Sequence, residues 1–146
     1  MSRRCDLTFD PKDFSAMSAI DTYFEADHYA VGGASPRAHK YGYKVLRALL
    51  DSGRHVDPIH PAADEILGRT VYPRLQDCPI APQSLSIITP PEITRKLVDD
   101  AIEVGVRCVW MQPGAEDAEA SRKAREAGLE VIDDGSCILV ALSLGR

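Results

Sequence analysis

Short apolar runs alternate with helical patterns along most of this chain. The first run, 29–33, ends in two glycines, and after a polar loop the segment 41–52 repeats apolar residues such as Val45 and Leu49 at helical spacing. Gly53 follows at the place where a left-handed helix end is favoured. The alternation continues and predicts further strands over 55–59, 84–89, 107–111 and 129–132, with helices from residue 91 to Gly105 and over 118–127.

The first residues of the chain do not follow this alternation of strand and helix patterns. Residues 1–13 are polar and contain a proline, which predicts a flexible arm in front of a domain covering 14–146. Ser15 is suited to cap a helix over about 16–26, in which apolar residues recur at helical spacing. The sequence therefore predicts one N-terminal helix before the first strand.

Two later segments are less regular. Residues 62–82 predict a short helical turn at 64–68, an extended piece at 71–73 and another turn at 75–77. The apolar segment 138–144 at the end of the chain is compatible with a helix or a strand.

The order of these elements indicates the fold class. Five short apolar runs separated by helical patterns are typical of repeated βα units, which give a parallel sheet with right-handed crossovers and helices on both faces. We predict a single Rossmann-like, doubly wound α/β domain with five strands, which is in keeping with a length of 146 residues. By analogy with such folds we expect the strand order 3-2-1-4-5.

Composition narrows the possible partners and location. With 17 basic and 22 acidic residues the formal net charge is −5, which argues against a general nucleic-acid binder but leaves room for an anionic small molecule. No apolar run approaches the ~18–20 residues of a membrane span, and charged residues follow the pair Arg3 and Arg4 where a signal segment would be apolar. We expect a cytoplasmic protein with no nucleic-acid or membrane partner.

The residues that could carry chemistry are scattered. Cys5, Cys78, Cys108 and Cys137 form no Cys-x-x-Cys pair, so free thiols are expected and a metal site is not. No histidine pairs with a carboxylate or nucleophile at a recognisable spacing. The sequence shows no catalytic constellation and favours a protein that is not an enzyme.

The position of a ligand site follows from the predicted sheet. Ligands of open parallel sheets bind beyond the carboxyl ends of the strands, near the point where the strand order reverses. The five loops that leave these ends all contain glycine, proline or small polar residues: 33–41, 60–62, 89–91, 112–114 and 133–137. Turn formation alone explains any one of them, but their agreement at one end of the sheet favours a binding site.

The first of these loops suggests a phosphorylated ligand. Its glycines, Gly32 and Gly33, lack the third glycine of a dinucleotide fingerprint, and the loop carries Arg37, His39 and Lys40, which suit several phosphates. The second strand ends at His60, where an NAD site expects an acidic residue. Both departures disfavour NAD.

Several motifs in this order and spacing resemble one family. They are Ala30-Val31-Gly32-Gly33-Ala34-Ser35, Lys40-Tyr41-Gly42-Tyr43, Val56-Asp57-Pro58-Ile59-His60-Pro61, Ile66-Leu67-Gly68, Val71-Tyr72-Pro73, Thr89-Pro90-Pro91-Glu92, Val109-Trp110-Met111-Gln112-Pro113-Gly114-Ala115 and Cys137-Ile138-Leu139. Together they are similar to the small stand-alone CoA-binding proteins, whose domain resembles the CoA-binding domain of the succinyl-CoA synthetase α subunit. His60 departs from a frequent asparagine.

The resemblance implies coenzyme A or an acyl-CoA as ligand, bound without catalysis. It also implies roles along the site: phosphates at the backbone of Gly33, Ala34 and Ser35 and at Arg37, Lys40 and Tyr41; adenosine at His60 and Pro61; the cofactor path at Thr89, Pro90 and Pro91; pantetheine at Gln112 and Gly114; and the thiol end near Cys137. Because ligases of this kind keep their catalytic groups on other domains, a protein partner acting in trans is a further expectation.

Other functions stay open. An NAD(P)-binding redox enzyme or sensor is the second hypothesis, since Arg37 or Lys40 could hold a 2′-phosphate. An interaction protein with a vestigial pocket is the third. Cys137 is either a plain half-buried thiol or a redox-active group that forms a mixed disulfide with CoA.

Overall fold

The computed structural model describes residues 19–146. Five parallel strands form one sheet in the order β2-β1-β5-β6-β7. Their bounds are β1 His28–Gly32, β2 His55–Ile59, β5 Ser84–Ile87, β6 Cys108–Met111 and β7 Glu130–Ile132. The predicted Rossmann-like α/β domain with a single five-stranded parallel sheet is confirmed.

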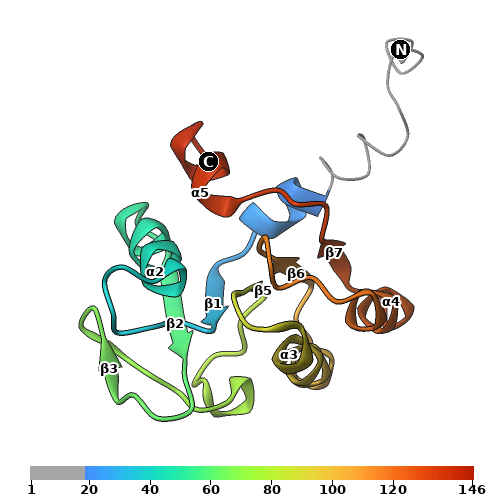
Figure 1. Cartoon of the computed structure of the whole chain (residues 1–146), viewed down its shortest axis with the longest axis horizontal. Coiled ribbons are helices and arrows are strands. Elements are labelled where there is room, and N and C mark those ends of the chain that lie inside the picture. The colour runs from blue at the N-terminus through green and yellow to red at the C-terminus, as the bar shows by residue number, and fades with distance from the viewer. Residues whose placement is uncertain (1–18) are drawn as a thin grey trace.

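Helices cover both faces of this sheet (Figure 1). One face carries α2 (Tyr41–Asp51), α5 (Ile138–Ser143) and the helical residues 19–24. The other carries α3 (Pro91–Val104) and α4 (Ala118–Glu126). The C-terminal segment is thus a helix, and within the N-terminal helix expected over about 16–26 the described residues 19–24 are helical. The predicted arm, 1–13, lies outside the described residues.

The predicted strand order 3-2-1-4-5 is wrong. The third main strand of the chain, β5, pairs with β1 on the side opposite to β2, so the order of the five strands along the chain is 2-1-3-4-5. Beyond β2 lies a bridge between Ile59 and Tyr72, in which the Tyr72 N–H donates to the Pro58 carbonyl at 3.0 Å. The Arg69 side chain also reaches β2 there, with Nε donating to the Val56 carbonyl at 3.3 Å. Pro73 follows Tyr72 directly and has no N–H with which to continue a ladder.

This strand order fixes the point from which the connections run to opposite sides of the sheet. The chain leaves β1 for β2 on one side and later returns to the other side of β1 with β5. The switch point of the sheet therefore lies between β1 and β5, and the loops after these strands border it.

The region 62–82 differs from the prediction in one place. Instead of a helical turn at 64–68, β3 (Glu65–Ile66) and β4 (Arg69–Thr70) form a short antiparallel pair. Leu67 and Gly68 join them with positive φ values of 52° and 76°, the combination of a tight hairpin turn. The turn expected at 75–77 is present as the 3-10 helix η2 (Leu75–Asp77).

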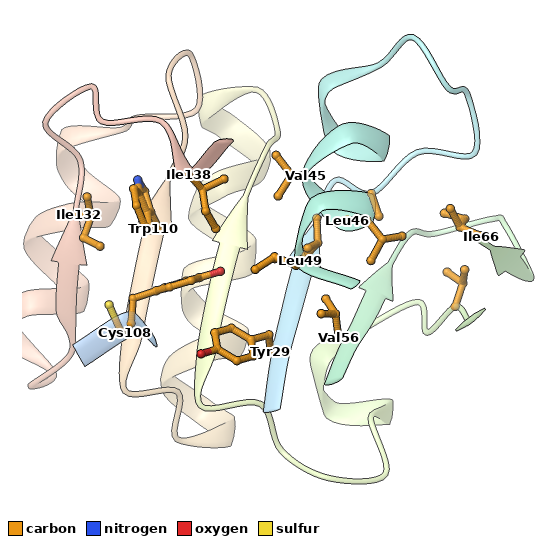
Figure 2. Packing of buried hydrophobic residues seen from close by; sticks show 14 of the residues in the cluster. Tyr29, Val45, Leu46, Leu49, Val56, Ile66, Cys108, Trp110, Ile132 and Ile138 are labelled. Carbon is orange, nitrogen blue, oxygen red and sulfur yellow. The ribbon is translucent and has the colours of Figure 1, made fainter. Parts of the chain in front are cut away.

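An aromatic cluster anchors the face that carries α5. Tyr23 and Trp110 are fully buried and meet edge to face, with ring centroids 5.1 Å apart, and the Tyr23 hydroxyl lies 2.8 Å from Ser86 Oγ. Figure 2 shows Trp110 and Ile138 in the same cluster as residues of α2. Trp110 Nε1 donates to the Ser136 carbonyl at 3.0 Å, which ties the loop after β7 to the core.

Candidate functional site

A cavity of about 610 Å³ lies at the carboxyl ends of the strands. It is lined by the first residue of α2 and by the loops after β5, β6 and β7: Tyr41, Ile88, Thr89, Pro90, Pro113, Gly114, Ala115 and Cys137. The cavity therefore borders the switch point between β1 and β5, where a ligand of this fold class is expected.

Two glycines let the first loop pack closely against its neighbours. A Cβ on Gly33, whose φ is 89°, would lie 2.1 Å from the Ile88 carbonyl oxygen, and a Cβ on Gly42 would lie 2.1 Å from the Gly33 carbonyl oxygen. Such separations are far below van der Waals contact, so each position needs glycine. Gly42 thus packs on Gly33, and Gly33 packs on Ile88. These contacts hold the start of α2 close to the loop after β5, next to the switch point.

The N-terminus of α2 is open. Its N-cap, Lys40, makes no side-chain cap, and the first turn contains no acidic residue. The N–H groups of this turn and the positive end of the helix dipole are therefore available to an anion. Arg37 and Lys40 are exposed beside it, and the Arg37 N–H donates to Ser35 Oγ at 3.1 Å, which shapes the turn before the helix.

A buried threonine connects two walls of the cavity. Thr94 of α3 is fully buried, and its hydroxyl donates to the Ala115 carbonyl at 2.9 Å, with the Pro90 carbonyl at 3.3 Å. Both partners are acceptors, so the 2.9 Å contact between the hydroxyls of Thr89 and Thr94 must use the Thr89 proton. Thr89, a residue of the cavity lining, consequently keeps lone pairs on its hydroxyl oxygen that can accept a further N–H or O–H.

The opposite wall contains a polar chain of three side chains. Gln112 is fully buried, and its Oε1 accepts from the Tyr41 hydroxyl at 3.2 Å and from the Ile138 N–H at 2.9 Å. The Tyr41 oxygen lies 2.6 Å from Cys137 Sγ. Burial, and then the neighbouring thiol, raise the pKa of Tyr41, so its hydroxyl keeps its proton at neutral pH. Among the described residues, Gln112 Nε2 has no hydrogen-bond partner.

Only part of the predicted site lies in the wall of the cavity. Tyr41, Thr89, Pro90, Gly114 and Cys137 line it. Gln112 contacts one of these side chains from behind the wall, whereas the other predicted residues lie outside the lining: Gly33, Ala34, Ser35, Arg37, Lys40, His60, Pro61 and Pro91. Tyr41, expected near phosphates, instead contacts a thiol and an amide.

His60 has a local structural contact. Its Nδ1 accepts from the N–H groups of Ala62 and Ala63, both at 3.0 Å, and so caps the loop after β2. Pro61, next to it, is exposed. Sequence reasoning did not single out Ile88, Pro113 or Ala115 as site residues, although each directly neighbours a predicted one in the same loop.

The described part of the chain contains neither a candidate metal site nor a candidate membrane span. Residues 19–146 contain no group of three or more His, Cys, Asp or Glu side chains able to hold a metal ion. In the same range no helix has the length and apolar character needed to cross a membrane.

Fold and cavity together define a Rossmann-like domain with a small-ligand site at its switch point. The chain belongs to the CoA-binding domain family, because the model of that family, described as a CoA binding domain, matches residues 27–143. The resemblance found in the sequence motifs is confirmed.

The chain is also similar to individual proteins in sequence and in fold. The uncharacterised protein YneT of Bacillus subtilis (strain 168) is 29% identical over 112 residues, which are 77% of this chain and 82% of YneT. A hypothetical protein from Pyrococcus horikoshii OT3 has a TM-score of 0.85 and 28% identity, over 99% of this chain and 98% of that one. The apo form of the dinucleotide forming acetyl-coenzyme A synthetase 1 of Ca. Korarchaeum cryptofilum has a TM-score of 0.67 and 29% identity, over 75% of this chain and 26% of that one.

Proposed function

We propose that this protein binds coenzyme A or an acyl-CoA at the carboxyl ends of its strands and catalyses no reaction of its own on that ligand. The proposal rests on one observation: an apolar surface and an anion-binding surface meet at the same place. An apolar cavity lined by proline, isoleucine and alanine meets the uncapped N-terminus of α2, and Tyr41 belongs to both.

The two surfaces match the two parts of the ligand. The phosphates suit the open helix N-terminus and the cations Arg37 and Lys40 beside it. The slender pantetheine arm suits the apolar cavity, where the acceptor on Thr89 faces the kind of amide N–H that this arm contains. Family membership supports CoA over other anionic ligands.

The remaining assignments extend this arrangement. We assign the phosphates to the backbone of Gly33, Ala34 and Ser35, and the adenosine end to His60 and Pro61. Pro90 and Pro91 border the cofactor path, and Gln112, Gly114 and Cys137 lie toward the pantetheine end. A partner in trans is part of the proposal, because this domain corresponds to about a quarter of the similar acetyl-CoA synthetase chain.

Thermal unfolding with CoA, acetyl-CoA, NAD and NADP in parallel tests the proposal. A ligand specific for the native state, present at a hundredfold excess over its Kd, stabilises it by about 2.7 kcal/mol. For a domain of this size that is a rise in Tm of roughly 5–10 °C. A rise with CoA or acetyl-CoA alone is expected, whereas a rise with NAD or NADP alone, or with none of the four, would contradict it.

A charge variant sharpens the test. Replacing Arg37 and Lys40 together by alanine should weaken CoA binding and flatten its dependence on salt, because two cations no longer meet the phosphates. Arg47→Ala on the exposed side of α2 is the matched control. Titration calorimetry at two salt concentrations gives both quantities, and equal affinities for the double variant and the control would rule out this phosphate site.

A further inference from the structure

The three cysteines that the structure describes differ in their surroundings. Burial raises the pKa of the Cys78 and Cys108 thiols to about 12, and for Cys78 the nearby Asp57 carboxylate adds to the effect. Both thiols therefore stay protonated at neutral pH, and a protonated thiol is a poor nucleophile. Cys137 instead forms part of the wall of the cavity.

Two polar side chains, Tyr41 and Gln112, lie beside Cys137. The Tyr41 hydroxyl, 2.6 Å from Sγ, keeps its proton at neutral pH and is able to donate it to a thiolate. The Gln112 amide lies against this hydroxyl and against the peptide N–H that follows Cys137. The amide keeps one donor, Nε2, fully buried and without a partner among the described residues. This unused donor lies behind the cavity wall, in the same polar group as Tyr41 and Cys137.

We propose that Cys137 captures coenzyme A covalently by thiol–disulfide exchange with a CoA disulfide, an inference that rests on the proposed CoA site. One CoA half occupies the cavity with its sulfur beside Cys137. The Cys137 thiolate attacks that sulfur, a Cys137–CoA disulfide forms, and the original S–S bond breaks. The second CoA leaves as a thiolate and takes up the proton that Cys137 has lost. One disulfide is consumed and one is formed, so no other oxidant is required.

The surrounding groups have separate parts in this exchange. Tyr41 is a positioning residue, which donates to the Cys137 thiolate and holds it in the cavity wall. Gln112 lies behind these two side chains; when the Tyr41 proton turns from its Oε1 to the thiolate, Oε1 keeps the Ile138 N–H as its donor. The reaction stores CoA on the protein while disulfides are abundant and releases it when a reducing thiol attacks the mixed disulfide.

Intact mass spectrometry of the full chain tests the inference. The reduced protein is mixed with CoA disulfide or with glutathione disulfide at neutral pH, and the modified cysteine is located by peptide mapping. We expect one CoA per chain, attached at Cys137 and removed by dithiothreitol. Its rate should saturate with CoA disulfide concentration and exceed the rate with glutathione disulfide by roughly tenfold or more, because binding precedes exchange.

Variants separate the reactive thiol from its surroundings. Cys137→Ser should lose the adduct, and Cys78→Ser, which removes a thiol outside the cavity, should keep it. Tyr41→Phe should lower the plateau rate roughly tenfold, because the thiolate loses a donor. A merely structural role for the tyrosine would leave that rate unchanged once CoA disulfide saturates the site.

Three results would overturn the inference: no adduct at Cys137, an adduct that forms equally fast with glutathione disulfide, or equal labelling of Cys78. Binding of reduced CoA to the wild type, measured with reductant present, is the independent test of the proposed function. If reduced CoA binds and Cys137 stays unmodified, covalent capture is wrong and the binding site stands. If reduced CoA does not bind, the proposed function itself fails.

Discussion

Thr94→Val is the sharpest test of how the cavity is held together. Valine has nearly the shape of threonine, so the fully buried side chain keeps its packing and loses only the hydroxyl. The loss removes the donor to the Ala115 carbonyl, 2.9 Å away, and the acceptor for the Thr89 hydroxyl. A buried polar group left unpaired costs about 1–3 kcal/mol, which for this length is a fall in Tm of roughly 3–10 °C.

The same variant should also weaken CoA binding. Without Thr94 as acceptor, Thr89 can turn its own proton toward the cavity, where the ligand amide needs a lone pair. Loss of one hydrogen bond of this kind corresponds to a rise in Kd of roughly two- to tenfold. Titration calorimetry measures it well below the melting temperature.

Thr94→Ser is the matched control, because it keeps the hydroxyl and removes one methyl group. It should cost about 1 kcal/mol in stability from lost apolar burial and leave the Kd near the wild-type value. The reasoning is refuted if Thr94→Val melts with the wild type, or if the serine variant binds CoA as poorly as the valine variant.

Two further variants test the loop packing and the cap of α4. Gly42→Ala should prevent the start of α2 from docking, since its Cβ would lie 2.1 Å from the Gly33 carbonyl oxygen; circular dichroism should show a large loss of Tm, and a wild-type Tm would contradict this packing. Asp117 is the N-cap of α4, and its contacts with Arg95 and the Ala120 N–H lower the pKa of its carboxyl below the ordinary value of 3.8. The ionised carboxylate therefore stabilises the fold above pH 3.8, and this stabilisation is lost as the pH falls through the lowered pKa. The difference in Tm between wild type and Asp117→Asn should therefore be largest near pH 6 and shrink in acid, and a difference independent of pH would argue against the ion pair.

The sequence predicted the sheet well because its signals were local. Buried strands read as short apolar runs, and a glycine ends α3: Gly105 takes the left-handed conformation, φ 86°, that stops a helix. The strand order was not local. It depends on whether the third predicted strand, 84–89, pairs outside β2 or crosses to β1, and this strand, β5, pairs with β1.

In the candidate site, too, the features with local sequence signals were predicted and those that depend on distant residues were not. Exit loops of parallel strands are recognisable from sequence, so Tyr41, Thr89 and Cys137 could be placed at one end of the sheet. Thr94 could not be recognised, because its hydroxyl acts on a carbonyl 21 residues further along the chain. The β3–β4 turn was missed because Leu67, with a φ of 52°, is not a residue type that signals a left-handed turn.

The bridge at Tyr72, on the outer edge of β2, has a consequence for association. An uncovered outer strand invites a strand from another molecule and, with it, aggregation. At the outer edge of β2 the Pro58 carbonyl already accepts from the Tyr72 N–H, and Pro58 has no backbone N–H that could donate to another strand. At the opposite edge, β7 is only three residues long and starts with the exposed Glu130. We expect neither edge of the sheet to offer another molecule a long strand for pairing.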